Sequence, residues 1–312
     1  MNKSTPHLGK FDIDIATLII SSNTYPAKKN SDMQKKIFFE QDFDKKLTYW
    51  YKAGLETEMR GSRFKTFEND LLINTDDGTT NMGLKTLMAL EWLEENKNYD
   101  FVVRPTPSSY LNFNNLYNHI STSFNGVEYV YSGKIQSTND NAGNKINFVS
   151  GSTLILNRNT VLKILRNRDL WDHSYWDDVA LYMLLRELEI TPQPFERYDV
   201  RGNAITENIP LNFYQYRCRA DNHYNYPRFL ESTNMKVVHK VTNNLKIGNI
   251  EKIFLKLYYF FAKLFYIYQF GWRAYLLIRN VMKFILPQRV YLLIKLKFSK
   301  QIESFKNVRF KT

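Results

Sequence analysis

The sequence has few of the features that mark a secreted protein. It holds one cysteine, Cys218, among 312 residues, so no disulfide can form within the chain. Disulfides accumulate in oxidising compartments, and a single cysteine therefore favours a reducing one. The first 14 residues, MNKSTPHLGKFDID, contain no apolar run of the kind that a secretory signal requires. Both features predict a cytoplasmic protein.

The sequence also has little net charge outside its C-terminal end. Residues 251–312 carry 13 Lys or Arg and two Glu, a net charge of +11, whereas the whole chain carries +12. The first 250 residues are therefore close to neutral, which argues against a nucleic-acid groove spread over them. An RNA-binding tail is disfavoured too, because the aromatic residues of the tail come with long aliphatic runs. We expect no nucleic-acid partner.

The composition is that of a folded protein with a large core. Hydrophobic residues make up 44% of the chain and aromatic residues 15%. A chain of this length and composition can bury one large domain and carry an appendage. Together with the charge distribution, this predicts a main domain over residues 1–245 and a separate basic tail over residues 246–312.

A strand, a helix and a second strand organise the middle of the main domain. Residues 71–73 form a short apolar run that predicts a buried strand, and the apolar positions of residues 84–92 have helical spacing. Residues 101–103 predict the second strand. Ligands of such parallel units gather beyond the carboxyl ends of the strands. We therefore expect an α/β fold with its chemistry near residues 104–109.

Four groups of residues in and after this unit carry a resemblance to a known family. They are Asp77, Asn81, Leu84, Lys85 and Thr86; Tyr110, Leu111 and Asn112 after the strand YDFVV; Ser150 and Gly151 before the strand at 153–156; and Trp176, Asp177, Asp178 and Val179 at a helix start. These groups resemble the β-1,3-galactosyltransferase and fringe family of sugar transferases, over roughly residues 15–240 if one domain of ordinary size is assumed. The resemblance implies a GT-A fold, which is a Rossmann-like mixed sheet flanked by helices. It also implies an inverting hexosyltransferase that uses a nucleotide sugar, a UDP-sugar above all.

The resemblance implies a set of donor-binding residues along one edge of the sheet. Residues 16–20 predict a strand, and the hydroxyl and amide groups that follow it suit a uridine pocket, although a polar helix cap would have the same composition. Lys85 is either a surface lysine or a cation aimed at phosphate, and His239 is either a core residue or a phosphate ligand. The predicted donor-binding set comprises Ser21, Ser22, Asn23, Lys85, Arg104, Thr106, Ser108, Ser109, Arg217 and His239.

One departure from the family concerns its metal. Where the family carries an Asp-rich metal motif after the second strand, this sequence has Thr106, Pro107 and Ser108. Asp76 and Asp77 precede the helix, where acidic residues complement the helix dipole. Negative charge builds on the diphosphate as the sugar leaves, so a metal or cationic side chains must neutralise it. The lost motif implies the cations of the donor-binding set. We expect no cofactor, since a divalent ion such as Mn²⁺ has no DxD motif to hold it.

The adjacent acidic residues Asp177 and Asp178 are the candidate catalytic pair. Both precede an apolar helix predicted for residues 179–188, so each could simply cap that helix. The resemblance implies instead that Asp178 takes the proton from the attacking acceptor hydroxyl. Asp177 would then cap the helix or hold an acceptor hydroxyl.

The residues predicted to bind the acceptor lie around this pair. Trp176 offers an apolar face to a sugar ring. Ser150 and Gly151 interrupt a strand, where a missing side chain lets a sugar approach the backbone, unless the interruption is only a β-bulge. The polar stretch 127–144 predicts a strand followed by a mobile loop that covers the site.

The basic tail has the pattern of a helix that lies on a membrane. Lys252, Lys256 and Lys263 occupy one side of the first predicted helix, among aromatic and aliphatic residues. The same lysines interrupt the apolar run and disfavour a spanning helix. The basic and apolar pattern continues over residues 272–286 and 290–298. We expect an anionic membrane surface as the partner, with a helical hairpin packed on the domain or on another subunit as the competing interpretation.

The sequence thus predicts a glycosyltransferase peripheral to the cytoplasmic membrane face, with a glycan or lipid-linked acceptor. The alternative from a different class is a non-catalytic protein of the same fold that holds a glycan or a partner at the membrane. Asp177 and Asp178 favour the enzyme, whereas the loss of the metal motif at residues 106–108 favours the alternative.

Overall fold

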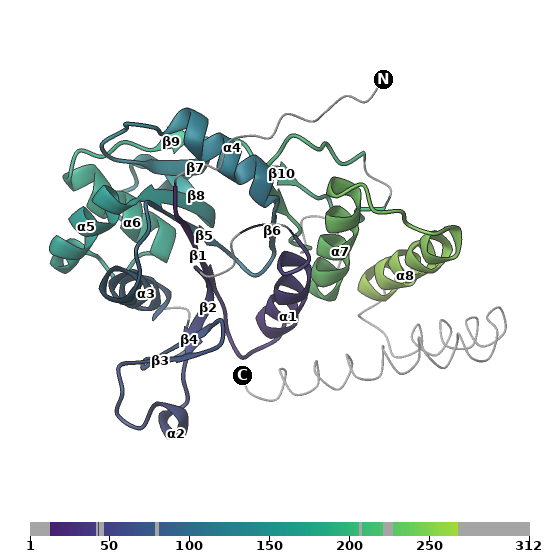
Figure 1. Ribbon diagram of the computed structural model, residues 1–312, viewed down its shortest axis with the longest axis horizontal. Helices are drawn as coiled ribbons and strands as arrows, with labels where there is room; N and C mark the ends of the chain where they lie inside the picture. The colour runs from purple at the N-terminus through teal and green to yellow at the C-terminus, as the bar shows by residue number, and fades with distance from the viewer. Residues whose placement is uncertain are drawn as a thin grey trace. The chain divides into compact units, whose positions relative to one another are not determined.

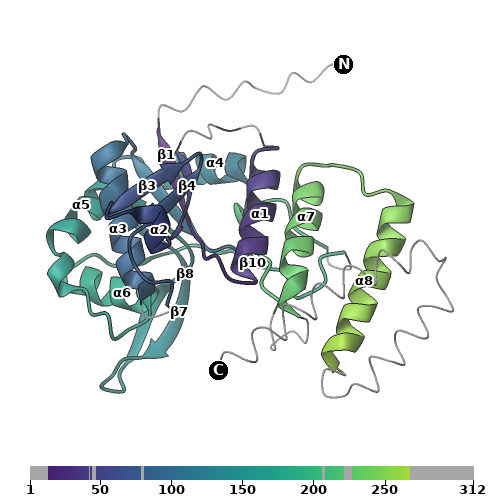
Figure 2. The ribbon, with the colours of Figure 1, turned by 90° about the horizontal axis from the view of Figure 1, so that it is seen from below.

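The computed structural model describes residues 13–41, 43, 47–78, 81–205, 208–220 and 227–267. Within these residues the chain forms an eight-stranded mixed sheet of order β3-β4-β2-β1-β5-β8-β7-β9 and a three-stranded sheet of order β10-β11-β6 (Figure 1). Helices α3, α5 and α6 lie together on one face of the large sheet, and α1 and α7 lie side by side on the other (Figures 1 and 2). The predicted α/β class, with a mixed sheet flanked by helices, is confirmed.

The elements have the following bounds. The strands are β1 (Ile15–Ile20), β2 (Thr48–Ala53), β3 (Phe64–Phe67), β4 (Asp70–Ile73), β5 (Phe101–Pro105), β6 (Ser109–Leu111), β7 (Tyr131–Asn139), β8 (Lys145–Asn157), β9 (Gln193–Pro194), β10 (Tyr198–Asp199) and β11 (Gln215–Arg217). The helices are α1 (Ala27–Phe38), α2 (Glu56–Met59), α3 (Met82–Asn96), α4 (Phe113–Ser123), α5 (Arg158–Arg166), α6 (Asp177–Glu187), α7 (Glu231–Thr242) and α8 (Asn249–Ile267), with the 3-10 turns η2 (Arg168–Leu170) and η4 (Arg228–Leu230).

The predicted strand, helix and strand are β4, α3 and β5. Both strands run parallel to β1 and β2, as predicted, but they are not neighbours in the sheet. β2 and β1 lie between them, because β4 pairs with β2 and β5 pairs with β1. The carboxyl ends of four strands therefore meet at one edge of the sheet, and the residues that follow β1, β2, β4 and β5 are candidates for chemistry.

Side-chain alternation in β2 places Tyr49 and Trp50 against different helical layers. Successive side chains of a strand point to opposite faces. Tyr49 packs edge-on against Trp92 of α3, with ring centroids 4.8 Å apart. Trp50 faces the other layer, where its ring lies 6.2 Å from that of Phe38 in α1. The large sheet is thereby buried on both faces, which is the usual environment of parallel strands.

The stretch 127–144 contains the predicted strand, and the residues that follow it form the short turn 140–144. The strand is β7, which lies wholly within this stretch and forms an antiparallel hairpin with β8, and Figure 2 shows this hairpin reaching past the other strands. Ile146 and Phe148 on one face of the hairpin pack against Val179 of α6. The strand part of the prediction is confirmed, and the Tyr131 side chain of β7 is buried in the main core.

The chain divides into two compact units. The first comprises Met1–Arg219 and Glu231–Lys246, and the second comprises Ala220–Leu230 and Ile247–Thr312. Helix α8, in the second unit, contains the described part of the basic tail, and residues 268–312 lie outside the described residues. Among the helices described, none is long and apolar enough to cross a membrane. The assignment of separate functions to residues 1–245 and 246–312 stays a prediction.

We expect Gly83→Ala to destabilise the fold, although alanine is the better helix former. A Cβ at Gly83, in the first turn of α3, would lie 2.6 Å from Nε1 of the buried Trp171. Overpacking costs about 1–3 kcal/mol, whereas replacing a helical glycine gains at most about 1 kcal/mol. Urea unfolding should show a net loss of stability. Gly248→Ala, where the added Cβ meets no atom within 4 Å, should not lose stability. Equal stabilities of the two variants would contradict the close packing of α3 on Trp171.

Candidate active site

The loop after β1 contains three of the predicted donor-binding residues. Ser21 is buried, and its hydroxyl oxygen lies 2.8 Å from that of Ser31 in α1. Ser22 donates a hydrogen bond of 2.5 Å to the Asp77 carboxylate, and Asn23 is exposed. The structure therefore connects the loop after β1 with the segment after β4, and leaves Asn23 open to solvent.

Lys85 lies at the same edge and is not a surface lysine. Its side chain is 3% exposed, and its Nζ lies 2.6 Å from Oδ1 of Asp77. Asp77 thus accepts from both Ser22 and Lys85. The sequence analysis interpreted Asp77 as a negative charge that complements the dipole at the start of the helix. In the structure Asp77 forms an ion pair with Lys85 of that helix. A hydroxyl, a carboxylate and an ammonium group form one polar cluster here.

Arg104 lies within β5, not in the loop beyond it as the sequence analysis supposed. Because side chains alternate along a strand, Arg104 shares a face with Val102, which belongs to the core cluster that includes α3 and α6. Only 2% of Arg104 is exposed. Its side chain therefore points into the helical layer, and its contact with a donor diphosphate remains a prediction.

The guanidinium group of Arg104 is held by partners from four elements. Nε donates to the Tyr51 hydroxyl at 3.0 Å, Nη1 donates to the Gly151 carbonyl at 2.8 Å, and Nη2 forms an ion pair with Asp177. Nη2 also lies 3.4 Å from the Thr86 hydroxyl in α3. Burial lowers the pKa of Arg104, but the charge of Asp177 opposes this, and the pKa lies above its ordinary value. This is a charged and fully partnered guanidinium.

Asp177 and Asp178 are neighbours at the start of α6 with different environments. Asp177 faces Arg104, whereas Oδ2 of Asp178 accepts the Gly151 amide at 2.8 Å and Oδ1 accepts the Val179 amide at 3.0 Å. Burial, followed by the charge of Asp177, raises the pKa of Asp178. A carboxylate with a raised pKa is the better general base near neutral pH, so Asp178 is the member of the pair suited to accept a proton.

Gly151 lies in a bulge of β8 between two buried serines. β7 advances two residues, from Gly133 to Ile135, while β8 advances five, from Val149 to Leu154. The bulge interpretation of this stretch is therefore confirmed. A Cβ at Gly151 would lie 2.9 Å from Nη1 of Arg104 and 3.1 Å from Oδ2 of Asp178, so only glycine fits between these two groups without displacing them.

The turn that replaces the metal motif of the resembling family is fixed by hydrogen bonds. Nε2 of the buried Gln34 donates to the carbonyls of Thr106 at 3.0 Å and Ser109 at 2.7 Å. The Thr106 amide and the Ser109 hydroxyl both donate to the carbonyl of Ser152, and the Ser108 carbonyl accepts from the backbone at Cys218. Ser108 and Ser109 are both buried, so their contact with a donor would require a path that reaches the turn.

Three further predicted residues lie in different surroundings. Arg217 is in β11, where its backbone pairs with that of Ser109. His239 is buried in α7, with Nδ1 3.3 Å from the Tyr110 hydroxyl and Nε2 3.1 Å from a carboxylate oxygen of Glu40; burial lowers the pKa of its ring. These contacts do not involve Arg104, Asp178 or Lys85, and the donor role of His239 stays a prediction. Trp176 precedes the acidic pair and is 71% exposed.

Sequence reasoning missed four residues that organise this site. They are Gln34, Tyr51, Thr86 and Arg197, and all four are buried. Thr86 and Tyr51 bond each other at 3.0 Å beneath Arg104. A polar residue inside an apolar helix is the signal that could have marked Thr86, since buried polar groups need partners. Gln34 lies in the mostly polar helix α1 and carries no such signal. No local pattern marks Arg197.

In the described part of the chain, no three His, Cys, Asp or Glu side chains are grouped so that they could hold a metal ion. Asp177 and Asp178 are adjacent carboxylates, but Asp177 is paired with Arg104. Metal independence remains a prediction that an experiment has to test.

Comparisons with known proteins give partial likenesses to sugar transferases. No protein-family model matches the sequence, and no curated protein matches it. Among solved structures, a glycosyltransferase involved in glycosylation of the major capsid of PBCV-1 is similar over 72% of this chain and 100% of its own, with a TM-score of 0.46 and 9% identity. The glycosyltransferase GlyE of Streptococcus pneumoniae TIGR4 covers 73% of this chain and 63% of its own, with a TM-score of 0.41 and 12% identity.

A third similar structure is the galactosyltransferase LgtC in complex with donor and acceptor sugar analogs. It covers 77% of this chain and 99% of its own, with a TM-score of 0.40 and 10% identity. At these low scores and identities, the chemistry of the present site has to be derived from its own residues.

We expect Asp178→Asn to remove a loss of stability that the wild type suffers as the pH rises. Because the folded protein raises the pKa of Asp178, the folded state binds this proton more tightly than the unfolded state does. Stability is therefore lost as the pH rises from the ordinary aspartate pKa of about 3.9 through the raised value, and an asparagine, which cannot ionise, avoids this loss. Urea unfolding from pH 4 to pH 8 should show an advantage of the variant that grows with pH.

Asp172→Asn serves as a control of opposite sign. The Ser174 hydroxyl, followed by its amide, lowers the pKa of the exposed Asp172, so removal of that carboxylate should not stabilise the protein at neutral pH. A difference in stability between Asp178→Asn and the wild type that does not shift in favour of the variant from pH 4 to pH 8 would contradict the raised pKa of Asp178.

Proposed function

We propose that this chain is an inverting glycosyltransferase that moves a sugar from a nucleotide-sugar donor, a UDP-sugar above all, to a glycan or lipid-linked acceptor. The observation that carries the proposal is the environment of Asp178. Its carboxylate is partly buried, has a raised pKa, and lies at a helix start beside a glycine bulge and an exposed tryptophan. The sequence resemblance supplies the reaction class, and this geometry supplies a base for it.

The proposed step begins with the acceptor hydroxyl near Asp178. As the hydroxyl oxygen forms a bond to the anomeric carbon of the donor, its proton passes to the Asp178 carboxylate. The bond from that carbon to the diphosphate oxygen breaks, and its electron pair leaves with the nucleoside diphosphate. Attack opposite to the leaving group inverts the configuration at the anomeric carbon.

The charge on the leaving diphosphate needs cations nearby. Lys85 is the proposed donor-side cation, since its ammonium group is buried at the carboxyl edge of the sheet beside Ser22 and Asp77. Preorganised donors in a dry site stabilise developing negative charge strongly. The amides and hydroxyls of residues 21–23 and 106–109 would bind the rest of the nucleotide in this proposal, without a metal ion.

Arg104 acts on the catalytic pair in this scheme. Two adjacent carboxylates repel each other, and like charges disfavour ionisation. By pairing with Asp177, the Arg104 guanidinium compensates one of the two charges. The ion pair therefore reduces the repulsion that ionisation of Asp178 meets from its neighbour.

We further propose that α8 binds an anionic membrane surface and so brings the enzyme to a membrane-bound acceptor. Its exposed apolar residues include Ile250, Ile253 and Phe260, which are 71%, 59% and 58% exposed. Lys252 and Lys256 are exposed on the same helix. An amphipathic helix with lysines beside large apolar side chains is suited to the headgroup region, and each cation near an anionic surface contributes about 1 kcal/mol.

We expect the protein, solubilised in detergent, to release free nucleoside diphosphate from one member of a panel of nucleotide sugars, in EDTA as well as in Mn²⁺. Asp178→Asn should abolish this release, because the base is lost, while leaving the donor dissociation constant unchanged. Asp172→Asn, on the exposed turn before α6, is the matched control and should retain the wild-type rate.

Three results would count against parts of this proposal. A near-normal rate in Asp178→Asn would remove Asp178 as the base. A tenfold loss on chelation, with recovery in Mn²⁺, would contradict metal independence. If no donor is bound or turned over under either condition, the non-catalytic alternative replaces the enzyme.

The membrane proposal predicts that the full-length protein sediments with vesicles that contain anionic lipid at low salt and is released at high salt, because salt screens the attraction of the lysines. Lys252→Glu/Lys256→Glu should weaken the sedimentation severalfold. The control Lys28→Glu/Lys36→Glu, which makes the same charge change on exposed positions of α1, should not. A full-length protein that stays in the supernatant at low salt would overturn the proposal.

A further inference from the structure

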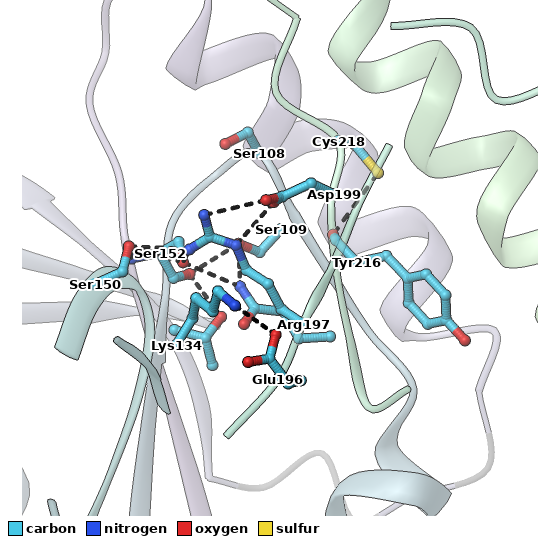
Figure 3. Close-up of polar contacts among 12 residues, drawn as sticks. Ser108, Ser109, Lys134, Ser150, Ser152, Glu196, Arg197, Asp199, Tyr216 and Cys218 are labelled. Atoms are coloured by element: carbon cyan, nitrogen blue, oxygen red, sulfur yellow. Dashed lines mark hydrogen bonds and ion pairs between the residues drawn. The ribbon is translucent and has the colours of Figure 1, made fainter. Parts of the chain in front are cut away.

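Arg197 is a buried arginine that no step of the proposed reaction uses. It lies between β9 and β10, and its side chain is 3% exposed. Figure 3 shows its guanidinium directed at two serines of β8. Nη1 donates to the Ser150 hydroxyl at 3.0 Å and also to the Ser152 hydroxyl, while Nε donates to the Asp199 carboxylate at 2.8 Å. Arg197 therefore holds one serine on each side of Gly151.

The segment that Arg197 holds is the bulge of β8. Between the pairs Ile135–Val149 and Gly133–Leu154, the β7–β8 ladder has no paired residues. A bulge loses ladder hydrogen bonds, so its conformation has to be fixed by other groups. The two serine hydroxyls also lie 3.3 Å from each other, and Gln215 donates to Ser152 at 3.4 Å. Arg197 is the charged group in this set.

The peptide groups of Gly151 transmit the position of the bulge to the acidic pair. The Gly151 amide donates to Asp178 at 2.8 Å, and the Gly151 carbonyl accepts from Arg104 at 2.8 Å. The Arg104 and Asp178 side chains both lie so close to Gly151 that a Cβ added there would crowd them. A shift of the bulge by a fraction of an ångström would therefore break or lengthen the bond to the candidate base.

We propose that Arg197 is a positioning residue, which fixes the Gly151 bulge and through it holds the Asp178 carboxylate in the orientation that accepts the acceptor proton. This inference rests on the proposed function for its effect on catalysis. It does not require Arg197 to touch either substrate.

The chemistry of arginine suits this role. Its planar fork presents several N–H donors in fixed directions, so one group can bond two hydroxyls and a carboxylate at the same time. Asp199 compensates the charge of Arg197, and burial of a cation requires such a partner. A lysine could keep the charge but could not hold all three partners in one geometry.

The first experiment compares Arg197→Met and Arg197→Lys with the wild type. We expect kcat to fall by about two orders of magnitude in Arg197→Met, the effect of a misplacement on the order of 1 Å, and by less in Arg197→Lys. The donor dissociation constant should stay within twofold. Arg63→Met is the control, because Arg63 forms its ion pair with Glu91 and directly precedes β3, an edge strand that is separated from β8 by four other strands.

A double-mutant comparison tests whether Arg197 acts through the serines. In a Ser150→Ala/Ser152→Ala background, Arg197→Met should reduce kcat little further, because the contacts that it removes are already absent. The same additional loss in both backgrounds would overturn the inference, as would a folded Arg197→Met with wild-type kcat. If Arg197→Met does not fold, Arg197→Lys and the two single serine variants provide the same comparison.

A readout without turnover separates this inference from the proposed function. Carbon-13 NMR of aspartate carboxyl groups, with the Asp178 signal assigned by Asp178→Asn, gives the pKa of Asp178 in the absence of any donor. The hydrogen bond from the Gly151 amide lowers the pKa of Asp178, so its loss in Arg197→Met should raise that pKa. The pKa should stay unchanged in Arg63→Met. A wild type without turnover on any nucleotide sugar would refute the proposed function alone, whereas an unchanged Asp178 pKa in Arg197→Met would refute the role of Arg197.

Discussion

The carboxyl edge of the large sheet depends on the buried ion pair between Arg104 and Asp177. The partners come from β5 and α6, 73 residues apart in sequence, so the pair fixes a helix to a strand. Two buried charges lose their hydration, and their attraction compensates only with good geometry and further hydrogen bonds. The Tyr51 hydroxyl and the Gly151 carbonyl supply those bonds. Removal of one partner would leave an uncompensated charge in the layer between the sheet and α6.

This ion pair gives two neighbouring carboxylates different properties. Asp177 is neutralised by a cation, whereas Asp178 is bonded by two backbone amides and has a raised pKa from burial. In sites that need both an acid and a base, the environments of the two groups often give them different pKa values. Here the difference arises from the face of β5 that carries Arg104 and from the bulge that presents the Gly151 amide. Arg197 bonds the serines on both sides of that glycine. A second buried cation, which does not contact the acidic pair, therefore also supports it.

The sequence allowed the elements to be predicted wherever the apolar pattern was strong. β1, β4, α3 and β5 were found, because buried parallel strands and an apolar helix leave clear runs. The acidic pair was found as a motif. The direction of the Arg104 side chain was not, because it depends on which face of β5 is covered by α3 and α6. Arg197 was missed for a similar reason. Its serine partners lie 47 and 45 residues earlier in the sequence, and no local pattern indicates contacts over such a separation.

Helix α3 carries two consecutive residues that belong to different clusters. Lys85 contacts Asp77 on the side of the β1 loop, and Thr86 lies beneath Arg104 on the side of the acidic pair. Their backbone atoms are joined by one peptide bond inside a rigid helix. A displacement of α3 at Lys85 would therefore also move the support of Arg104. The fold thus links the two clusters mechanically through one turn of a helix.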